Sequence, residues 1–213
     1  MFQLAAAGIF LHRKGFSSRD IWQGTQPMFA IWLFLWPVYV SLAWLWVGLL
    51  MMVTVLLSTA LLKPVPWQDL QQAWSGNTAP VSTPLPYPPL CLWLSLLIVA
   101  VLFESGMPEF GLGLGLVAVL AFPLAALIDR LSLWPMGIAL HPEHTLAGHM
   151  VLVLATAVLC AWSIHAYHGI DWYLLFPTSI MAGCLASLVR MTFPQWWNLP
   201  LAILSMALML WYL

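Results

Sequence analysis

The most polar stretch of this sequence is HPEHTLAGH, residues 141–149, which holds three of the six histidines. The side chains in it that can bind a metal ion are His141, Glu143, His144 and His149. Their spacing matches neither HExxH nor another strong zinc pattern. Thr145 is a typical helix N-cap residue, and a helix N-terminus attracts phosphate. Three interpretations stay open: a helix start with interfacial histidines, a contact for phosphate or nucleotide, or a transition-metal site.

Two further groups of charged residues could do chemistry. Asp129 and Arg130 end a long apolar run, where an ionisable residue is costly unless it is paired or functional. Asp129 is therefore a candidate site residue, and a salt bridge between the two neighbours is the alternative. Arg13 and Lys14 precede the first apolar run. Such a pair either binds a phosphate or lipid headgroup, or only fixes the orientation of the chain in a membrane.

A third polar set consists of Glu104, Glu109, His165, His168 and Asp171. His165 and His168 are three residues apart near the end of a predicted helix, which allows a metal or proton-handling site. The loops around them are short, so we expect solvated helix ends instead.

The composition indicates the medium in which these residues lie. Of the 213 residues, 63% are hydrophobic and 6% are charged, against roughly 25% charged in an ordinary soluble domain. This is the composition of an integral membrane protein. The net charge of −1 and the scattered basic residues exclude nucleic acid as a partner.

Apolar runs of about 20 residues predict one all-α, polytopic helical bundle of about seven spans in a single domain, 1–213. The run 28–62 is too long for one crossing and predicts two spans. A Pro-rich linker, 63–89, follows it on the cytoplasmic side. The other five spans are predicted at 90–104, 110–128, 148–167, 172–190 and 195–213.

The basic residues predict the orientation. They are Arg13, Lys14, Arg19, Lys63, Arg130 and Arg190, and all fall in loops on one side of the predicted bundle. Because Lys and Arg concentrate in cytoplasmic loops, the N-terminus is expected inside and the C-terminus outside. The stretch 141–149 then faces the cytoplasm, and we expect a multi-pass protein of the bacterial inner membrane.

Two features inside the fourth predicted span concern packing. Gly111 and Gly115 form a GxxxG pair, which permits close approach of another helix. Pro123 lacks an N–H group and predicts a kink in the helix, a feature that often lies beside a cavity.

Four short motifs occur in the order found in a known superfamily. They are Arg13-Lys14, Tyr87-Pro88, HTLAGH at 144–149 and WNLPL at 197–201. Together they resemble the CTP-dependent membrane transferases, which include phytol kinase, dolichol kinase and phosphatidate cytidylyltransferase. Thr145 and Gly148 match the superfamily's Lys-Thr-x-Glu-Gly-Ser signature, in which His144, Ala147 and His149 replace Lys, Glu and Ser. The superfamily's Gly-Asp acid in the fourth span has no counterpart, because Pro123 lies in that neighbourhood.

The resemblance implies transfer from CTP to a lipid alcohol or lipid phosphate at the cytoplasmic leaflet, with Mg²⁺ neutralising the phosphates. In a site built on this chemistry, Asp129 and His144 are catalytic, and Asp129 and Glu143 bind Mg²⁺. The phosphate-binding candidates are Arg13, Lys14, Arg130, Thr145, Gly148, His149 and Asn198.

Two other functions compete with this one. The missing Gly-Asp acid and the 14 tryptophans favour a non-catalytic accessory or scaffold subunit of a larger membrane complex, because tryptophan suits lipid-facing and partner-facing surfaces. The histidines also allow a metal or proton site in a transporter-like bundle. The expected partners are accordingly membrane lipids, CTP and other membrane protein subunits.

Overall fold

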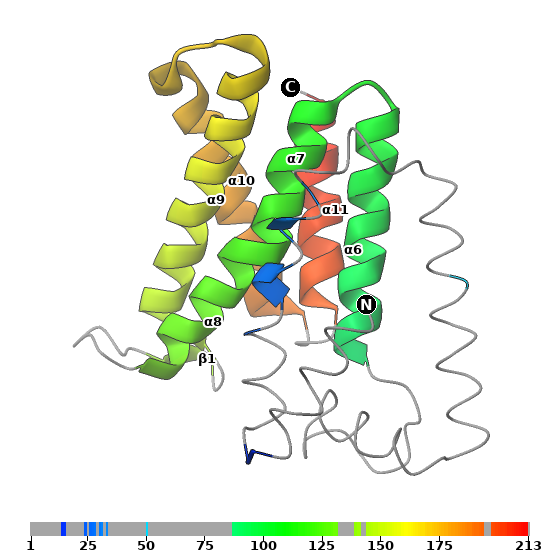
Figure 1. Cartoon of the computed structure of the whole chain (residues 1–213). Coiled ribbons are helices and arrows are strands. Elements are labelled where there is room, and N and C mark those ends of the chain that lie inside the picture. The colour runs from blue at the N-terminus through cyan, green and yellow to red at the C-terminus, as the bar shows by residue number, and fades with distance from the viewer. Residues whose placement is uncertain are drawn as a thin grey trace.

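A computed structural model describes residues 14–15, 24, 26–28, 30–31, 33, 50, 87–131, 139–141, 144–193 and 197–212. Most of these residues are helical (Figure 1). The helices are α6 (Tyr87–Glu104), α7 (Pro108–Leu116), α8 (Phe122–Leu131), α9 (Leu146–His168), α10 (Trp172–Thr192) and α11 (Asn198–Trp211). A π-helical turn, η2 (Val117–Ala121), joins α7 to α8, and a short 3₁₀ turn, η1 (Gln26–Met28), lies near the start of the chain.

In the described part of the chain, three helical rods are long and apolar enough to cross a membrane. They are Pro108–Leu131, which comprises α7, η2 and α8, together with α9 and α10. The apolar segments of α6 and α11 are shorter, at Cys91–Glu104 and Asn198–Trp211. Helices thus occupy all five spans predicted after residue 89. The first two predicted spans fall mainly outside the described residues.

The start of α6 differs from the prediction, which assigned residues up to 89 to the linker. Tyr87, Pro88 and Pro89 form the first turn of the helix. Proline is tolerated there because the first N–H groups of a helix have no partner within it. Residues 63–86 of the predicted linker lie outside the described residues.

The rods α6, Pro108–Leu131, α9, α10 and α11 run in alternating directions, which places the polar residues at two ends of the bundle (Figure 1). One end, lowest in the figure, contains the end of α8, the start of α9, the end of α10 and the start of α11. We call it the lower end, and it carries Arg130 and Arg190. The other end contains Glu109, His165 and His168.

Glycines bring the helices close together. A Cβ at Gly111 would meet the Phe103 ring at 2.7 Å, and one at Gly115 would meet the Leu33 side chain at 2.9 Å. The close approach predicted for this GxxxG pair is confirmed. Gly183 allows α10 to touch α9, since a Cβ there would lie 2.7 Å from the Val153 carbonyl oxygen.

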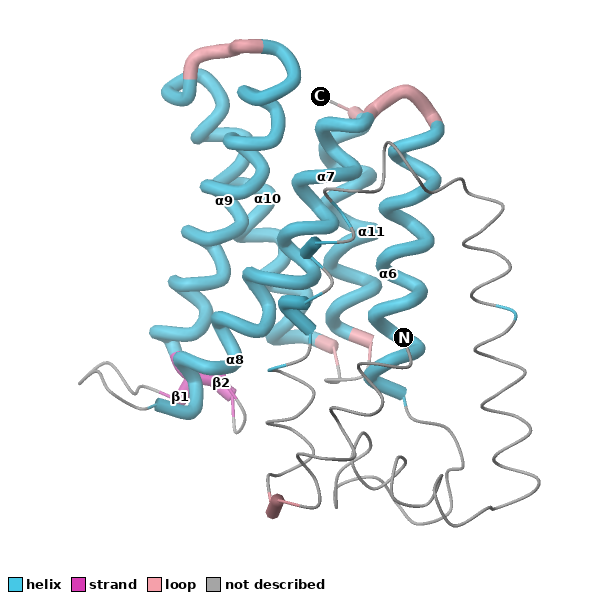
Figure 2. Tube along the Cα trace, viewed as in Figure 1, coloured by secondary structure: helices cyan, strands magenta, loops and turns pink. Residues whose placement is uncertain are grey.

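Within the described residues, one short sheet interrupts the helical fold. Two short antiparallel strands, β1 (Ala139–His141) and β2 (His144–Thr145), form a hairpin between α8 and α9 (Figure 2). Ala139 pairs with Thr145 and His141 with His144. The hairpin holds the chain at the lower end of the bundle directly before α9 begins.

Candidate functional site

The carboxylate of Asp129, in the last turn of α8, is the centre of a buried polar cluster. Its Oδ1 accepts a hydrogen bond from the Thr145 backbone N–H at 2.9 Å and one from the Thr145 hydroxyl at 2.8 Å. Its Oδ2 lies 2.7 Å from Arg190 Nη2 and 3.3 Å from His144 Nδ1. The side chains of Asp129, His144 and Arg190 are each no more than 5% exposed. Residues from α8, β2 and α10 therefore meet at one acid.

Thr145 takes part in this cluster because it is the N-cap of α9. Its backbone is extended, with φ −98° and ψ 157°, and its hydroxyl oxygen accepts a hydrogen bond from Gly148 N–H at 3.1 Å. The same hydroxyl donates to Asp129, so the cap links the helix to the acid. A negative charge beside a helix N-terminus is also stabilised by the helix dipole. The predicted N-cap is confirmed.

Residue 148 must be glycine because the Asp129 carboxylate lies against its Cα. A Cβ built on Gly148 would overlap the Asp129 carboxylate, with its Cγ only 2.6 Å away. Glycine at this position therefore allows α8 to pack directly against the first turn of α9. The contact to phosphate that the resemblance implies for Gly148 stays a prediction.

Arg190 is the member of the cluster that the sequence did not reveal. The sequence predicts Arg190 in a cytoplasmic loop after the sixth span, whereas it lies inside α10 with 3% of its side chain exposed. Its contact with Asp129 also replaces the alternative in which Asp129 pairs with its neighbour Arg130. The helical periodicity of α10 could have predicted that Arg190 is buried, because Arg190 lies on the same face as the small buried residues Ala182, Gly183 and Ala186.

His149 extends the cluster toward α10. Its Nδ1 lies 2.8 Å from the Ser187 hydroxyl, and its ring meets that of His144 edge to face at 5.9 Å between centroids. The ring is buried, with 4% of the residue exposed. His149 thus packs between α9 and α10 at the lower end of the bundle.

Among the residues that the structure describes, the other predicted site residues are not brought into this cluster. Asn198 is buried in the first turn of α11, and no contact among the described residues joins it to Asp129. Arg130 is partly buried in the last turn of α8, and Lys14 is exposed in a turn. Arg13 and Glu143 lie outside the described residues.

The cluster does not fit Mg²⁺. Magnesium binds through one or two carboxylates that face water or substrate phosphates, but both oxygens of Asp129 already accept from Thr145, Arg190 and His144. The guanidinium of Arg190 also neutralises the acid that would attract the ion. Within the described part of the chain, no group of three or more His, Cys, Asp or Glu residues could hold a metal ion.

The polar set at the opposite end makes local contacts. His168 Nε2 lies 3.3 Å from Glu109 Oε1, which links the end of α9 to the start of α7. His165 Nδ1 lies 2.7 Å from the Ile170 carbonyl oxygen across the turn between α9 and α10. His168 is half exposed, as expected for a solvated helix end, but only 12% of the Glu109 side chain is exposed.

Comparison with family models, with curated proteins and with solved structures finds no match for this chain.

Proposed function

We propose that this chain is a non-catalytic, divergent member of the CTP-dependent membrane transferase superfamily that serves as an accessory or scaffold subunit of a larger membrane complex. The observation that carries the proposal is the state of Asp129. A transferase of this kind needs an acid that holds a metal ion near the nucleotide phosphates. In this cluster both carboxylate oxygens of Asp129 are instead in contact with Thr145, His144 and Arg190.

The same contacts suit a structural role. Asp129 joins α8, the N-cap of α9 and α10 at one point, and Gly148 removes the side chain that would keep them apart. A buried charge pair of this kind is weak evidence for stability, but it fixes one arrangement of the elements that carry it. The cluster then acts as a clamp that holds three helices in register.

The proposal includes a location. Three helices long and apolar enough to cross a membrane support a multi-pass integral membrane protein. Arg130 and Arg190 both lie at the lower end of the bundle, which agrees with the predicted cytoplasmic side. We propose the bacterial inner membrane, with the N-terminus inside.

The first test is an assay for CTP-dependent lipid turnover. The full chain, purified in mild detergent, is supplied with radiolabelled CTP, Mg²⁺ and lipids extracted from its own membrane. The proposal predicts no labelled lipid and no saturable binding of CTP. Labelled product that disappears in Asp129→Asn but persists in Glu109→Gln would overturn it, since Glu109 is a largely buried acid at the other end of the bundle.

A second test addresses the assembly. A subunit of a larger complex is expected to migrate, after mild solubilisation of native membranes, at a mass above that of its own oligomers, with a companion chain in fixed stoichiometry. A chain that sediments alone from native membranes at every detergent concentration would contradict the scaffold function.

A catalytic function remains the second candidate, because one observation favours it. His144, Thr145, Gly148 and His149, which occupy the superfamily's signature, gather around Asp129 at the mouth of α9. A helix N-terminus beside Arg190 offers N–H groups and positive charge for a phosphate. This function predicts CTP binding that is lost in both His144→Ala and Asp129→Asn, which the turnover assay measures.

A further inference from the structure

The rod Pro108–Leu131 contains one π-helical turn, and this turn comes directly before a proline. The N–H of Phe122 donates to the carbonyl of Val117, five residues earlier, instead of to that of Ala118, four residues earlier. Pro123, the next residue, has no N–H to donate. In this π register the backbone partner of the Ala118 carbonyl would be residue 123, five residues later, so that carbonyl has no N–H to accept.

A side chain from far along the chain supplies the missing donor. The amide of Gln26, in η1, donates to the Ala118 carbonyl oxygen at 2.7 Å, and Gln26 is 4% exposed. Leu33, seven residues later, packs against Gly115 in the same rod. The segment that contains Gln26 and Leu33 thus meets the rod where its helical register changes.

The choice between the π and the α register at this turn depends on the side-chain amide of Gln26. Because Pro123 cannot donate, the turn must leave one carbonyl without a backbone partner. In the π register that carbonyl belongs to Ala118, and in a regular α-helix it would belong to Val119, four residues before the proline. Gln26 reaches the first of these and so favours the π turn.

The register matters for Asp129 because a π turn inserts one residue into a helix. Every residue after it is rotated by about 100° relative to a regular α-helix. In α8 the exposed residues Leu124, Leu127 and Leu131 form one stripe, and Asp129 lies about 170° around the helix from its centre. Without the π turn, Asp129 would move to the position that Arg130 now occupies, on the flank of the helix and away from Arg190.

We propose that Gln26 and Pro123 are positioning residues of the polar cluster, because together they select the π turn that aims Asp129 at Thr145 and Arg190. Neither residue touches the cluster; both act through the rotation of α8. The inference does not depend on whether the cluster is catalytic or structural.

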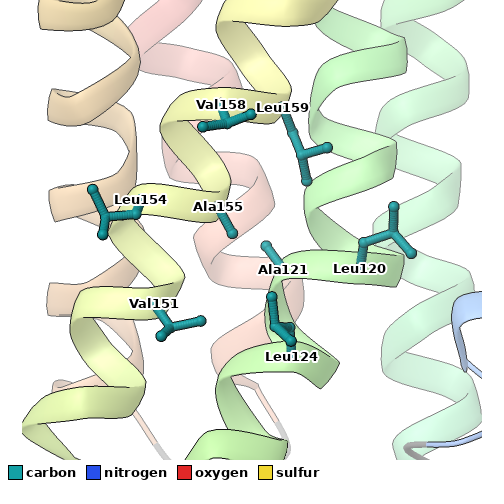
Figure 3. Close-up of a pocket in the computed structure, with 8 residues that line it drawn as sticks. All are labelled: Leu120, Ala121, Leu124, Val151, Leu154, Ala155, Val158 and Leu159. Atoms are coloured by element: carbon teal, nitrogen blue, oxygen red, sulfur yellow. The ribbon is translucent and has the colours of Figure 1, made fainter.

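The surface beside the turn agrees with a local irregularity in the rod. A groove of about 450 Å³ lies between the rod and α9, lined by Leu120, Ala121 and Leu124 from one side and Val151, Leu154, Ala155, Val158 and Leu159 from the other (Figure 3). Leu120 and Ala121 belong to the π turn itself. The groove thus borders the segment whose register the proposal concerns.

The test reads the rotation of α8 directly. In a Cys184→Ser background, which removes the exposed cysteine, nitroxide labels are attached at Ala126→Cys, Leu127→Cys or Ile128→Cys in full-length protein reconstituted in lipid vesicles. Collision of each label with dissolved O₂, which concentrates in the hydrocarbon, measures its exposure to lipid. The unperturbed chain is expected to give the highest collision rate at 127, because Leu127 is 45% exposed.

The maximum should move by one residue when the turn loses its determinants. In Gln26→Leu, and in the double variant Gln26→Leu with Pro123→Ala, we expect the highest collision rate at 126 and lower rates at 127 and 128. Ser95→Ala is the matched control, because it removes a buried side-chain to backbone hydrogen bond in α6; its maximum should stay at 127. If Gln26→Leu alone does not fold, the double variant still tests the proposal. Its alanine at position 123 restores a backbone N–H, so each carbonyl of the turn again has a donor. A maximum that stays at 127 in the double variant overturns the proposal.

Discussion

Replacing Gly148 with alanine should destabilise the protein, and the whole effect should come from displacement of the Asp129 carboxylate. The added Cβ would overlap the Asp129 carboxylate, so the acid must leave its position and release Thr145 and Arg190. Leaving one member of a buried ion pair without its partner costs about 3–5 kcal/mol. Alanine regains at most about 1 kcal/mol, because it is the better helix former. We expect a net loss of about 2–4 kcal/mol in the free energy of unfolding.

The effect should vanish when the carboxylate is absent. In an Asp129→Ala background the atoms that the new Cβ would overlap are gone, and the helical backbone of Gly148 accepts alanine. There we expect Gly148→Ala to change stability by less than about 1 kcal/mol, with the helix preference of alanine acting in its favour. The two substitutions should therefore show a coupling energy of about 3 kcal/mol.

The measurement is reversible unfolding in mixed micelles, followed by circular dichroism as the fraction of denaturing detergent rises. Gly183→Ala is the control, because its Cβ would meet the backbone of Val153, which Asp129 does not touch. Its cost should be the same in both backgrounds, within about 0.5 kcal/mol. If Gly148→Ala costs as much in the Asp129→Ala background as in the unmodified chain, the clamp around Asp129 is not the reason for the glycine.

Three further outcomes are expected. Arg190→Met alone should cost about 3–5 kcal/mol in unfolding experiments, whereas Arg190→Met with Asp129→Leu should cost much less, since no buried charge is left alone; equal losses would contradict this. Thr145→Val should lower stability by about 1–2 kcal/mol and Thr145→Ser by less, because serine keeps the N-cap hydroxyl; identical melting curves would argue against the cap. In intact cells, an impermeant maleimide should label Ile170→Cys but reach Lys14→Cys only after permeabilisation, and the reverse order would refute the predicted orientation.

The helices could be predicted because each is a long apolar run bounded by prolines, glycines and polar residues. Burial in a membrane needs little beyond length and hydropathy, so α9 and α10 begin and end within two residues of their predicted bounds. The gathering of Asp129, Thr145 and Gly148 also follows from the sequence, because alternating helices bring the end of one span and the start of the next to the same side.

The remaining details depend on tertiary contacts that no local pattern contains. The positive-inside rule correctly groups Arg190 with Arg130 at one end of the bundle, but it cannot show that Arg190 points inward to an acid 61 residues away. The π turn is similar. Pro123 predicts an irregular helix, whereas the choice between two registers is made by Gln26, whose partner is a carbonyl 92 residues later.

The ion pair between Asp129 and Arg190 sets a condition that a catalytic site at this cluster would have to meet. A phosphate group that approaches Arg190 must compete with a carboxylate only 2.7 Å from its Nη2, and a magnesium ion that approaches Asp129 must displace the same arginine. Neither ligand can bind unless the two side chains separate, at a cost of several kcal/mol for a pair this deeply buried. Thr145 holds the acid in place through both its N–H and its hydroxyl, so the Arg190 guanidinium is the group that has to move. Relaxation of the π turn would instead rotate α8 by about 100° and move Asp129 to the flank of the helix, away from both Arg190 and the N-terminus of α9. An active enzyme should thus lose CTP turnover when Gln26 is replaced by leucine, whereas a scaffold should only lose stability.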